Sequence, residues 1–222
     1  ISEYLGCQIF NLLGVEAQET ILGLYTFQGE TKVVVACKDF TSPGINLRDF
    51  ASLKNRVIDS SGEGYGTDLQ DIEYVIDEQT LFDRDVLMDR FWDMFVIDAF
   101  IGNWDRHNGN WGFLYNSYED SMSLAPVYDC GSSLFPQLDE ATMLLVLKDK
   151  AEMHHRIFNV PTSAIRNEGR RINYYEFISS LNHGECNRAL ERIVPRINMT
   201  AIGNIIEETP LISDIQKEFK KL

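Results

Sequence analysis

Three oxygen-bearing side chains lie on either side of a short alternating pattern, and their types suit a metal ion. Asp105 and Asn110 belong to "FIGNWDRHNGNWGFLY" at residues 100–115, and Asp129 follows "MSLAPVY". The two strand-like runs between them predict a hairpin, which would return the chain so that the three side chains converge. Mg²⁺ prefers carboxylate and amide oxygens and keeps its remaining positions for water and phosphate oxygens.

The chemistry that this set of side chains suits is phosphoryl transfer. In such reactions one Asp orients the attacking hydroxyl and accepts its proton, whereas an Asn and a second Asp hold the metal ions that neutralise the nucleotide phosphates. Asp105 fits the first role, and Asn110 and Asp129 fit the second. There are simpler alternatives, because Asp and Asn are common in turns and Asp129 could cap a helix beginning in "GSSLF". The order of the three residues around a hairpin favours the metal site.

A long buried helix and a tight hairpin are the elements that must position this loop. Asp83 is a typical helix N-cap residue, and Gly102 is a typical C-terminal stop. The apolar residues between them form a broad face: Leu87, Phe91, Met94, Phe95 and Phe100. The sequence therefore predicts a core helix that ends just before the loop and a hairpin that starts near Gly112 just after it.

The pattern of the first 40 residues predicts a small α+β unit. Ser2 can cap a helix that has Glu3 in its first turn, and apolar residues then recur at helical spacing until Gly14. Two strand-like runs follow at residues 19–27 and 32–40, and the four residues between them favour a hairpin turn.

The residue pattern of most of the remaining chain predicts helices. Residues 139–222 have the pattern of several helices separated by Gly184, Pro195 and Pro210. The segment "SSGEGYGTD" at residues 60–68 lacks the spacing of a P-loop and its Lys-Ser or Lys-Thr, so a flexible connector is predicted there. The fold class predicted from these patterns is α+β, mainly α.

Several of these motifs together resemble the HipA family of bacterial serine/threonine kinases, whose fold is similar to that of eukaryotic protein kinases. "DRHNGN" resembles the catalytic loop D-x-H-x-x-N, and "LAPVYDCGSS" resembles the L-x-P-x-Y-D segment with its metal-binding Asp. Upstream, "EYLGCQIFNLLGV" resembles the small-lobe helix, and "KVVVACKDF" resembles the last small-lobe strand and the hinge. The resemblance covers most of residues 2–135.

The resemblance implies a protein-kinase-like fold with a truncated small lobe and a largely helical large lobe. Residues 1–42 would form the partial small lobe, with its helix, β-hairpin and hinge. Residues 43–222 would form the large lobe, with the catalytic loop and the metal-binding hairpin.

The resemblance also implies roles for individual residues, with ATP and Mg²⁺ as cofactors. Asp105 would be the catalytic base or orienting group, His107 would brace the catalytic loop, and Asn110 and Asp129 would hold Mg²⁺. Glu3 would pair with an ATP-binding lysine, although it could equally be a favourable charge at a helix start. The backbone of four further residues would meet the adenine: Ala36, Cys37, Lys38 and Asp39.

The chain departs from the family pattern at the phosphate clamp. The phosphate-covering loop and its lysine should precede Glu3, but only two residues do so, and Lys32 and Lys38 come after the helix. The loss of one oriented donor typically costs about 3 kcal/mol of transition-state stabilisation. We therefore expect the chain as given to be poorly active or inactive.

Charge and cysteine use limit the classes of partner and compartment. The 222 residues carry a net charge of −14, which argues against direct binding of nucleic acid and against an anionic membrane surface. The cysteines are scattered without metal-binding spacing, which is typical of reduced thiols in a cytoplasmic protein: Cys7, Cys37, Cys130 and Cys186. The expected partners are a protein substrate and, from the family resemblance, an antitoxin protein.

Two alternative functions remain open from the sequence. "GNWDRHNGN" also resembles the D-R-H-x-x-N loop of phosphoinositide kinases, although "YDCGSS" departs from the D-F-G-like setting of their metal-binding Asp. The missing clamp also favours a pseudokinase-like binding module without catalysis. Retention of all three site residues, Asp105, Asn110 and Asp129, argues against that alternative.

Overall fold

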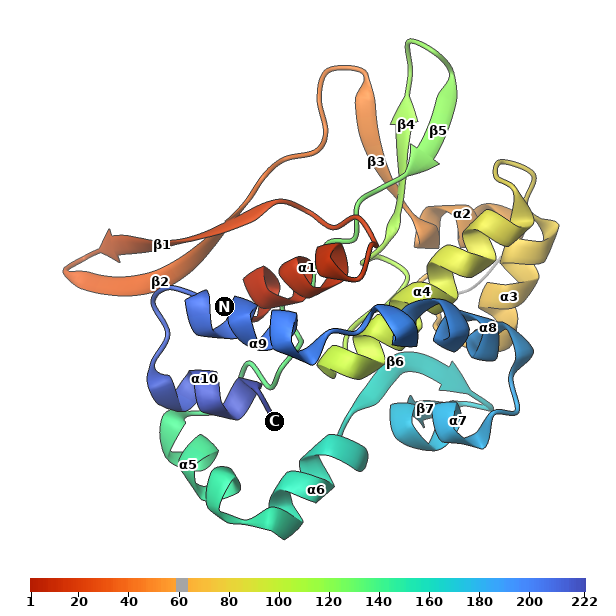
Figure 1. Cartoon of the computed structure of the whole chain (residues 1–222). Helices are drawn as coiled ribbons and strands as arrows, with labels where there is room; N and C mark the ends of the chain where they lie inside the picture. The colour runs from red at the N-terminus through yellow and green to blue at the C-terminus, as the bar shows by residue number, and fades with distance from the viewer. Residues whose placement is uncertain (59–63) are drawn as a thin grey trace.

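The computed structural model describes residues 1–58 and 64–222, and Figure 1 shows how the elements are arranged. The predicted connector at residues 60–68 lies partly outside the described residues. The elements, in chain order, are α1 Ser2–Leu12, β1 Thr20–Phe27, β2 Glu30–Cys37, β3 Ile45–Asp49, α2 Phe50–Val57, α3 Leu69–Glu78, α4 Arg84–Ile101, β4 Gly112–Asn116, β5 Ser121–Leu124, α5 Glu140–Lys148, α6 Lys150–Phe158, β6 Thr162–Asn167, β7 Arg170–Asn173, α7 Tyr174–Ser180, α8 Gly184–Ile193, the 3₁₀ helix η1 Val194–Arg196, α9 Met199–Glu208 and α10 Asp214–Lys220. The fold is mixed α and β, with more helix than strand.

Helix α4 is the central helix of the core, as the sequence predicted. The Asp83 carboxylate accepts hydrogen bonds from the backbone N–H groups of Asp85 and Val86, at 2.9 and 3.1 Å. Gly102 ends the helix in the left-handed conformation, with φ 64°, which glycine adopts without strain. Buried residues lie on all sides of α4, and Trp92 is fully enclosed. The helix therefore delivers a fixed backbone to the loop that follows it.

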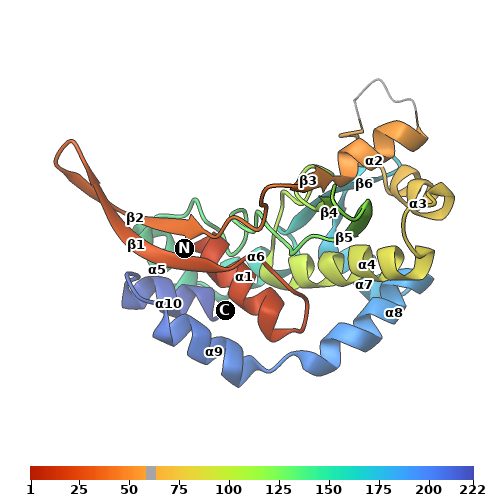
Figure 2. The same ribbon diagram turned by 90° about the horizontal axis from the view of Figure 1, so that it is seen from above.

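The main hydrophobic core joins α4 to helices from both ends of the chain. Helix α4 packs against α3, α8 and strand β6, whereas α1 packs against α9. Both views show α1 between α9 and the hairpin of β1 and β2 (Figures 1 and 2). Among the described residues, no helix has the length and apolar character needed to cross a bilayer.

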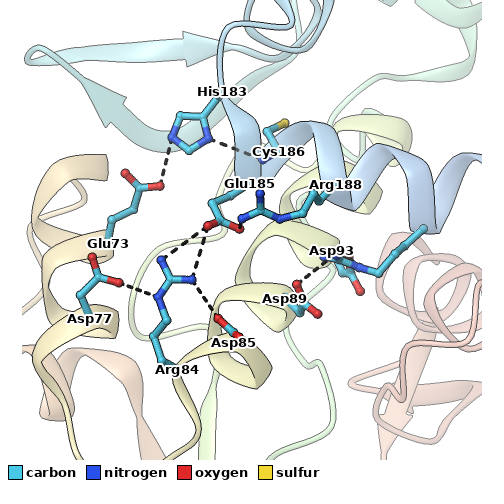
Figure 3. A network of polar contacts seen from close by, with 11 residues as sticks. Glu73, Asp77, Arg84, Asp85, Asp89, Asp93, His183, Glu185, Cys186 and Arg188 are labelled. Atoms are coloured by element: carbon cyan, nitrogen blue, oxygen red, sulfur yellow. Dashed lines mark hydrogen bonds and ion pairs between the residues drawn. The ribbon is translucent and has the colours of Figure 1, made fainter.

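A polar network at the start of α4 connects this helix to α3 and α8 (Figure 3). Arg84 Nε lies 2.9 Å from Asp77 Oδ1, and Arg84 Nη1 lies 3.4 Å from Glu185 Oε1 on α8. His183 caps the start of α8, and its Nε2 lies 3.0 Å from Glu73 Oε1 on α3. These groups are partly exposed, so each pair contributes little free energy to folding.

The β1–β2 hairpin projects from the rest of the chain (Figure 2). Its strands pair antiparallel from Thr20–Cys37 to Phe27–Glu30. The turn consists of Gln28 and Gly29, both with positive φ, which is the two-residue turn that matches the twist of a hairpin. The hairpin was predicted, with a turn two residues longer.

The other two sheets differ in part from the sequence prediction. The predicted hairpin of β4 and β5 is present, and β3 adds a third strand to it that the sequence patterns did not predict. Strands β6 and β7 form a hairpin in a region that was predicted to be helical, so that prediction was wrong. Their turn at Glu168 and Gly169 again has two positive φ angles, which is the local signal for a hairpin. The strands are only six and four residues long, so their alternation was weak.

The start of α1 also differs from the prediction. Ser2 is the first residue of the helix rather than its cap, and no side chain of the described residues caps this end. Ser2 is buried, so it is enclosed by the core rather than exposed at a helix end.

Candidate active site

The loop between α4 and β4 is held by its own hydrogen bonds. Asn110 Nδ2 donates to the Asp105 carbonyl at 3.0 Å, and Asp105 N donates to Asn103 Oδ1 at 3.2 Å. The His107 backbone N–H donates to the Asp105 carbonyl at 2.8 Å, and the Gly109 N–H donates to His107 Nδ1 at 3.1 Å. The His107 side chain thus contacts the loop itself, and this contact suits a bracing role.

Arg106 joins this loop to the segment that carries Asp129. Its Nη1 donates to the carbonyl oxygens of Asn110, at 2.7 Å, and Tyr128, and its Nη2 donates to Cys130 Sγ at 3.4 Å. One guanidinium group therefore fixes both the residue before and the residue after Asp129 relative to the loop. Sequence reasoning missed Arg106, whose only signal was its position beside Asp105 in the loop motif.

A buried carboxylate on α4 balances the charge of Arg106. Arg106 Nε and Nη2 donate to the two Asp98 oxygens at 2.9 and 3.2 Å, and Asn103 Nδ2 donates to Asp98 Oδ1 at 2.8 Å. Burial lowers the pKa of Arg106, but the Asp98 carboxylate outweighs burial and raises this pKa above its usual value. Arg106 therefore stays charged inside the core.

Asp129 lies exposed between two residues that Arg106 holds. Its φ is 56°, in the left-handed region that Asp and Asn tolerate better than most residues. No helix begins in residues 131–135, so the alternative in which Asp129 caps a helix is wrong.

Helix α1 brings Glu3 to the same place. An added Cβ on Gly131 would lie 3.4 Å from Glu3 Oε2 and 4.0 Å from Asp129 Oδ1, so the two carboxylates flank this glycine. Burial raises the pKa of Glu3, and the nearby Asp129 carboxylate raises it further, whereas a hydrogen bond from Cys7 opposes the rise. The ligand atoms of Glu3, Cys7 and Cys130 all lie within 4.8 Å of one another.

The close approach of α1 depends on Gly6, and we expect Gly6→Ala to destabilise the fold by about 1–3 kcal/mol. A Cβ on Gly6 would lie 2.5 Å from Cys130 Cβ, so either α1 or the segment with Asp129 must move. Gly203→Ala in α9 is the matched control, because a Cβ there meets no heavy atom within 4 Å and should stabilise the helix by roughly 0.5–1 kcal/mol. Urea denaturation measures both variants, and equal stability would contradict this packing.

The end of β2 comes near these carboxylates at Cys37. Burial raises the pKa of Cys37, and the Glu3 and Asp129 carboxylates raise it further, which places Cys37 near both. Ala36, Lys38 and Asp39 are exposed. Hydrogen bonds from the side chain and backbone of Thr41 lower the pKa of Asp39.

Neither lysine that follows α1 reaches Glu3. Lys38 Nζ lies 2.6 Å from Glu19 Oε1, and Lys32 Nζ lies 3.3 Å from Glu30 Oε2. Within residues 1–58 and 64–222, no Lys or Arg nitrogen lies within ion-pair distance of the Glu3 carboxylate. This agrees with the sequence argument that neither lysine occupies the position of an ATP-binding lysine.

The oxygen atoms suited to a metal ion are also those that the protein leaves without partners. Asn110 uses its Nδ2 within the loop, and in the described part of the chain its Oδ1 accepts no hydrogen bond. The carboxylates of Asp105 and Asp129 likewise have no hydrogen bond or ion pair among the described residues. The neighbouring Asp98 carboxylate, by contrast, is saturated. The donor set therefore fits Mg²⁺, which takes oxygen ligands.

Comparison with known proteins defines the class to which this fold and site belong. The family model "HipA-like C-terminal domain" matches residues 1–201. The chain therefore belongs to the HipA-like C-terminal domain family, which confirms the resemblance found in its motifs.

Individual relatives are consistent with that family. The chain is 48% identical over 219 residues to the serine/threonine-protein kinase CtkA of Helicobacter pylori strain J99, covering 98% of this chain and 66% of that kinase. The crystal structure of a Helicobacter pylori proinflammatory kinase CtkA matches with a TM-score of 0.94 at 47% identity, covering 99% of this chain and 79% of that one.

A more distant structure shares the fold alone. It is the Shewanella oneidensis toxin–antitoxin system of HipA and HipB with operator DNA, which matches with a TM-score of 0.52 at 17% identity. The match covers 99% of this chain and 52% of that chain.

Proposed function

We propose that this chain carries the catalytic and metal-binding part of an ATP-dependent serine/threonine protein kinase. One observation carries the proposal: Asp105, Asn110 and Asp129 have unpartnered oxygens on segments that Arg106 holds together. The 48% identity to a serine/threonine-protein kinase supports the same reaction. Because the chain spans 66% of that kinase, the activity of a whole kinase is part of the proposal.

In the proposed mechanism the reacting hydroxyl meets Asp105, which orients it and accepts its proton. Asn110 Oδ1 and the Asp129 carboxylate would hold Mg²⁺, which neutralises charge on the ATP phosphates when it is bound. The backbone of residues 36–39 would contact the adenine, and Glu3 would pair with an ATP-binding lysine. In this scheme residues 1–42 are a partial small lobe and residues 43–222 the large lobe.

The described residues provide no cation for Glu3, so the chain as given should transfer phosphate poorly while still binding Mg²⁺ and nucleotide. Calorimetry with ATP, in the presence and absence of Mg²⁺, tests the binding. Magnesium-dependent ATP binding supports the kinase proposal. Failure to bind either ligand favours the binding-module alternative. Rapid phosphorylation by this chain alone would show that the position of the lysine is misassigned.

Acceptor specificity separates the protein-kinase proposal from the lipid-kinase alternative. We expect ³²P from γ-labelled ATP to appear on serine or threonine of protein acceptors and not on phosphoinositides in vesicles. The net charge of −14 would repel such vesicles. Labelling of the lipid alone would contradict the proposal. An antitoxin partner and a cytoplasmic location remain predictions from the family resemblance and from the cysteines, which are free throughout the described residues.

A further inference from the structure

A cavity of about 420 Å³ lies between two separate hydrophobic clusters. The smaller cluster consists of Met143, Val146 and Phe219, from α5 and α10. The cavity is lined by α4, α6, α7, α8 and α10, which can be followed in Figure 1, and by Leu134 and Phe135. None of the proposed catalytic or metal-binding residues lines it. Its lining therefore excludes those residues, although Lys220 and Phe135 also border a neighbouring cavity that Glu3 and Gly131 line.

The cavity has a largely apolar lining that includes two cationic side chains. Apart from Arg156 and Lys220, every side chain in the lining is uncharged, and most are aliphatic or aromatic; the last residue, Leu222, adds its terminal carboxylate. Arg156 lies over the ring of Phe135, with its Cζ 5.7 Å from the ring centroid. Ligand pockets of about 300–1,000 Å³ typically combine such a lining with a few polar groups that orient the ligand.

Lys220 is the unusual member of this lining. It is only 8% exposed, and its Nζ donates to the Leu134 carbonyl at 2.9 Å. No carboxylate lies within 4.0 Å of this Nζ in the part of the chain that the structure describes. Burial lowers the pKa of Lys220 to about 8. Lysine is almost never buried without a partner, because the charged form loses its hydration.

A second buried lysine, Lys54, has the ion-pair partner that Lys220 lacks. Lys54 is 1% exposed, and its Nζ lies 2.9 Å from Asp71 Oδ2 and 2.7 Å from the Gly66 carbonyl. Lys54 therefore has the carboxylate that Lys220 lacks. In a chain of net charge −14, with 34 acidic residues, the absence of a nearby acid at Lys220 leaves room for an anion from outside.

We propose that this cavity binds a long-chain fatty acid, with its alkyl chain between α4, α6, α7 and α8 and its carboxylate on Lys220. An unbranched alkyl chain requires no hydrogen bonds, so the apolar lining can enclose it without leaving polar groups unpaired. An extended peptide segment would bring backbone N–H and C=O groups that this lining could not satisfy. A charged carboxylate gives the Lys220 ammonium a charge-assisted hydrogen bond.

Equilibrium dialysis of the full chain with radiolabelled palmitate, below its micelle concentration, tests the proposal. We expect saturable binding of one palmitate per chain. Lys220→Met, which keeps the length of the side chain but removes its charge, should weaken binding at least tenfold. Lys221→Met is the matched control, because Lys221 lies outside the cavity lining and pairs with Glu207. It should leave palmitate binding unchanged.

Two further measurements test the position of the alkyl chain and the need for a carboxylate. Ile157→Trp adds bulk at a lining position that is 43% exposed, so it should block palmitate binding without unfolding the chain. Hexadecanol, which has the same alkyl chain but no charge, should bind more weakly than palmitate and be insensitive to Lys220→Met. Circular dichroism confirms that each variant is folded.

Three outcomes would overturn the proposal. The first is no saturable palmitate binding by the folded wild-type chain. The second is an equal affinity for palmitate in the Lys220→Met and Lys221→Met variants. The third is binding that survives Ile157→Trp. If the natural occupant of the cavity is a protein segment and not a fatty acid, the first outcome is expected.

Discussion

Replacement of Asp129 by asparagine is expected to abolish magnesium-dependent ATP binding and to reduce phosphoryl transfer by at least about 10²–10³-fold. The Asp129 carboxylate is exposed and has no partner among the described residues, so its charge is available to a cation. Asparagine keeps the shape of the side chain and tolerates the φ of 56° at this position. The fold should therefore persist while the negative charge of this metal ligand is lost. Calorimetry with Mg²⁺ and ATP measures the effect.

Asp120→Asn is the matched control for this prediction. Asp120 lies at the turn between β4 and β5 with φ 46°, and its carboxylate accepts a hydrogen bond from the Tyr115 hydroxyl at 2.8 Å. It carries the same charge in the same backbone region but lies outside the site, so ATP binding should be unchanged. If Asp129→Asn bound Mg²⁺ and ATP as the wild-type chain does, the assignment of Asp129 as a metal ligand would be wrong.

Arg106→Met is expected to lower the free energy of unfolding by about 3–5 kcal/mol, because it leaves the Asp98 carboxylate buried and uncompensated. Arg106 is 4% exposed and Asp98 is fully buried. The substitution also frees the carbonyl oxygens of Asn110 and Tyr128, so the loop and the segment with Asp129 lose their common anchor. Urea denaturation measures the loss of stability, and we expect ATP binding to fall with it.

Two comparisons separate the buried pair from a general effect of losing an arginine. Adding Asp98→Asn to Arg106→Met removes the uncompensated charge, so the double variant should be more stable than Arg106→Met alone. Arg84→Met breaks the partly exposed network around α4 and should cost less than about 1 kcal/mol. Similar losses in Arg84→Met and Arg106→Met would contradict the role assigned to Arg106.

The parts of the fold that the sequence predicted depend on local signals. Asp83 and Gly102 mark the two ends of α4 through interactions within one turn of the helix. The hairpin of β4 and β5 follows from alternation across a short turn, and it brings Asp129 back toward the loop containing Asp105. These signals were enough to predict α4 and the hairpin, and Arg106 joins the loop after α4 to the residues on both sides of Asp129; the convergence of the Asp105, Asn110 and Asp129 side chains stays a prediction.

The parts that were not predicted depend on partners distant in the sequence. Strand β3 has only five residues, and it pairs with β4, whose residues come more than 60 positions later in the chain. From the sequence alone, Arg106 would be expected at the surface, because most arginines are exposed. Its burial depends on Asp98 and on carbonyl groups on both sides of the hairpin, which no local pattern reveals.

The hydrogen bonds of Arg106 also have a consequence for the entropy of binding. The loop and the segment with Asp129 are already fixed to one guanidinium group, so an arriving cation would meet oxygen atoms whose backbone needs no further ordering. Such preorganisation confines the entropic penalty of association mainly to the ligand. A site of this kind gains affinity from rigidity that folding has already established.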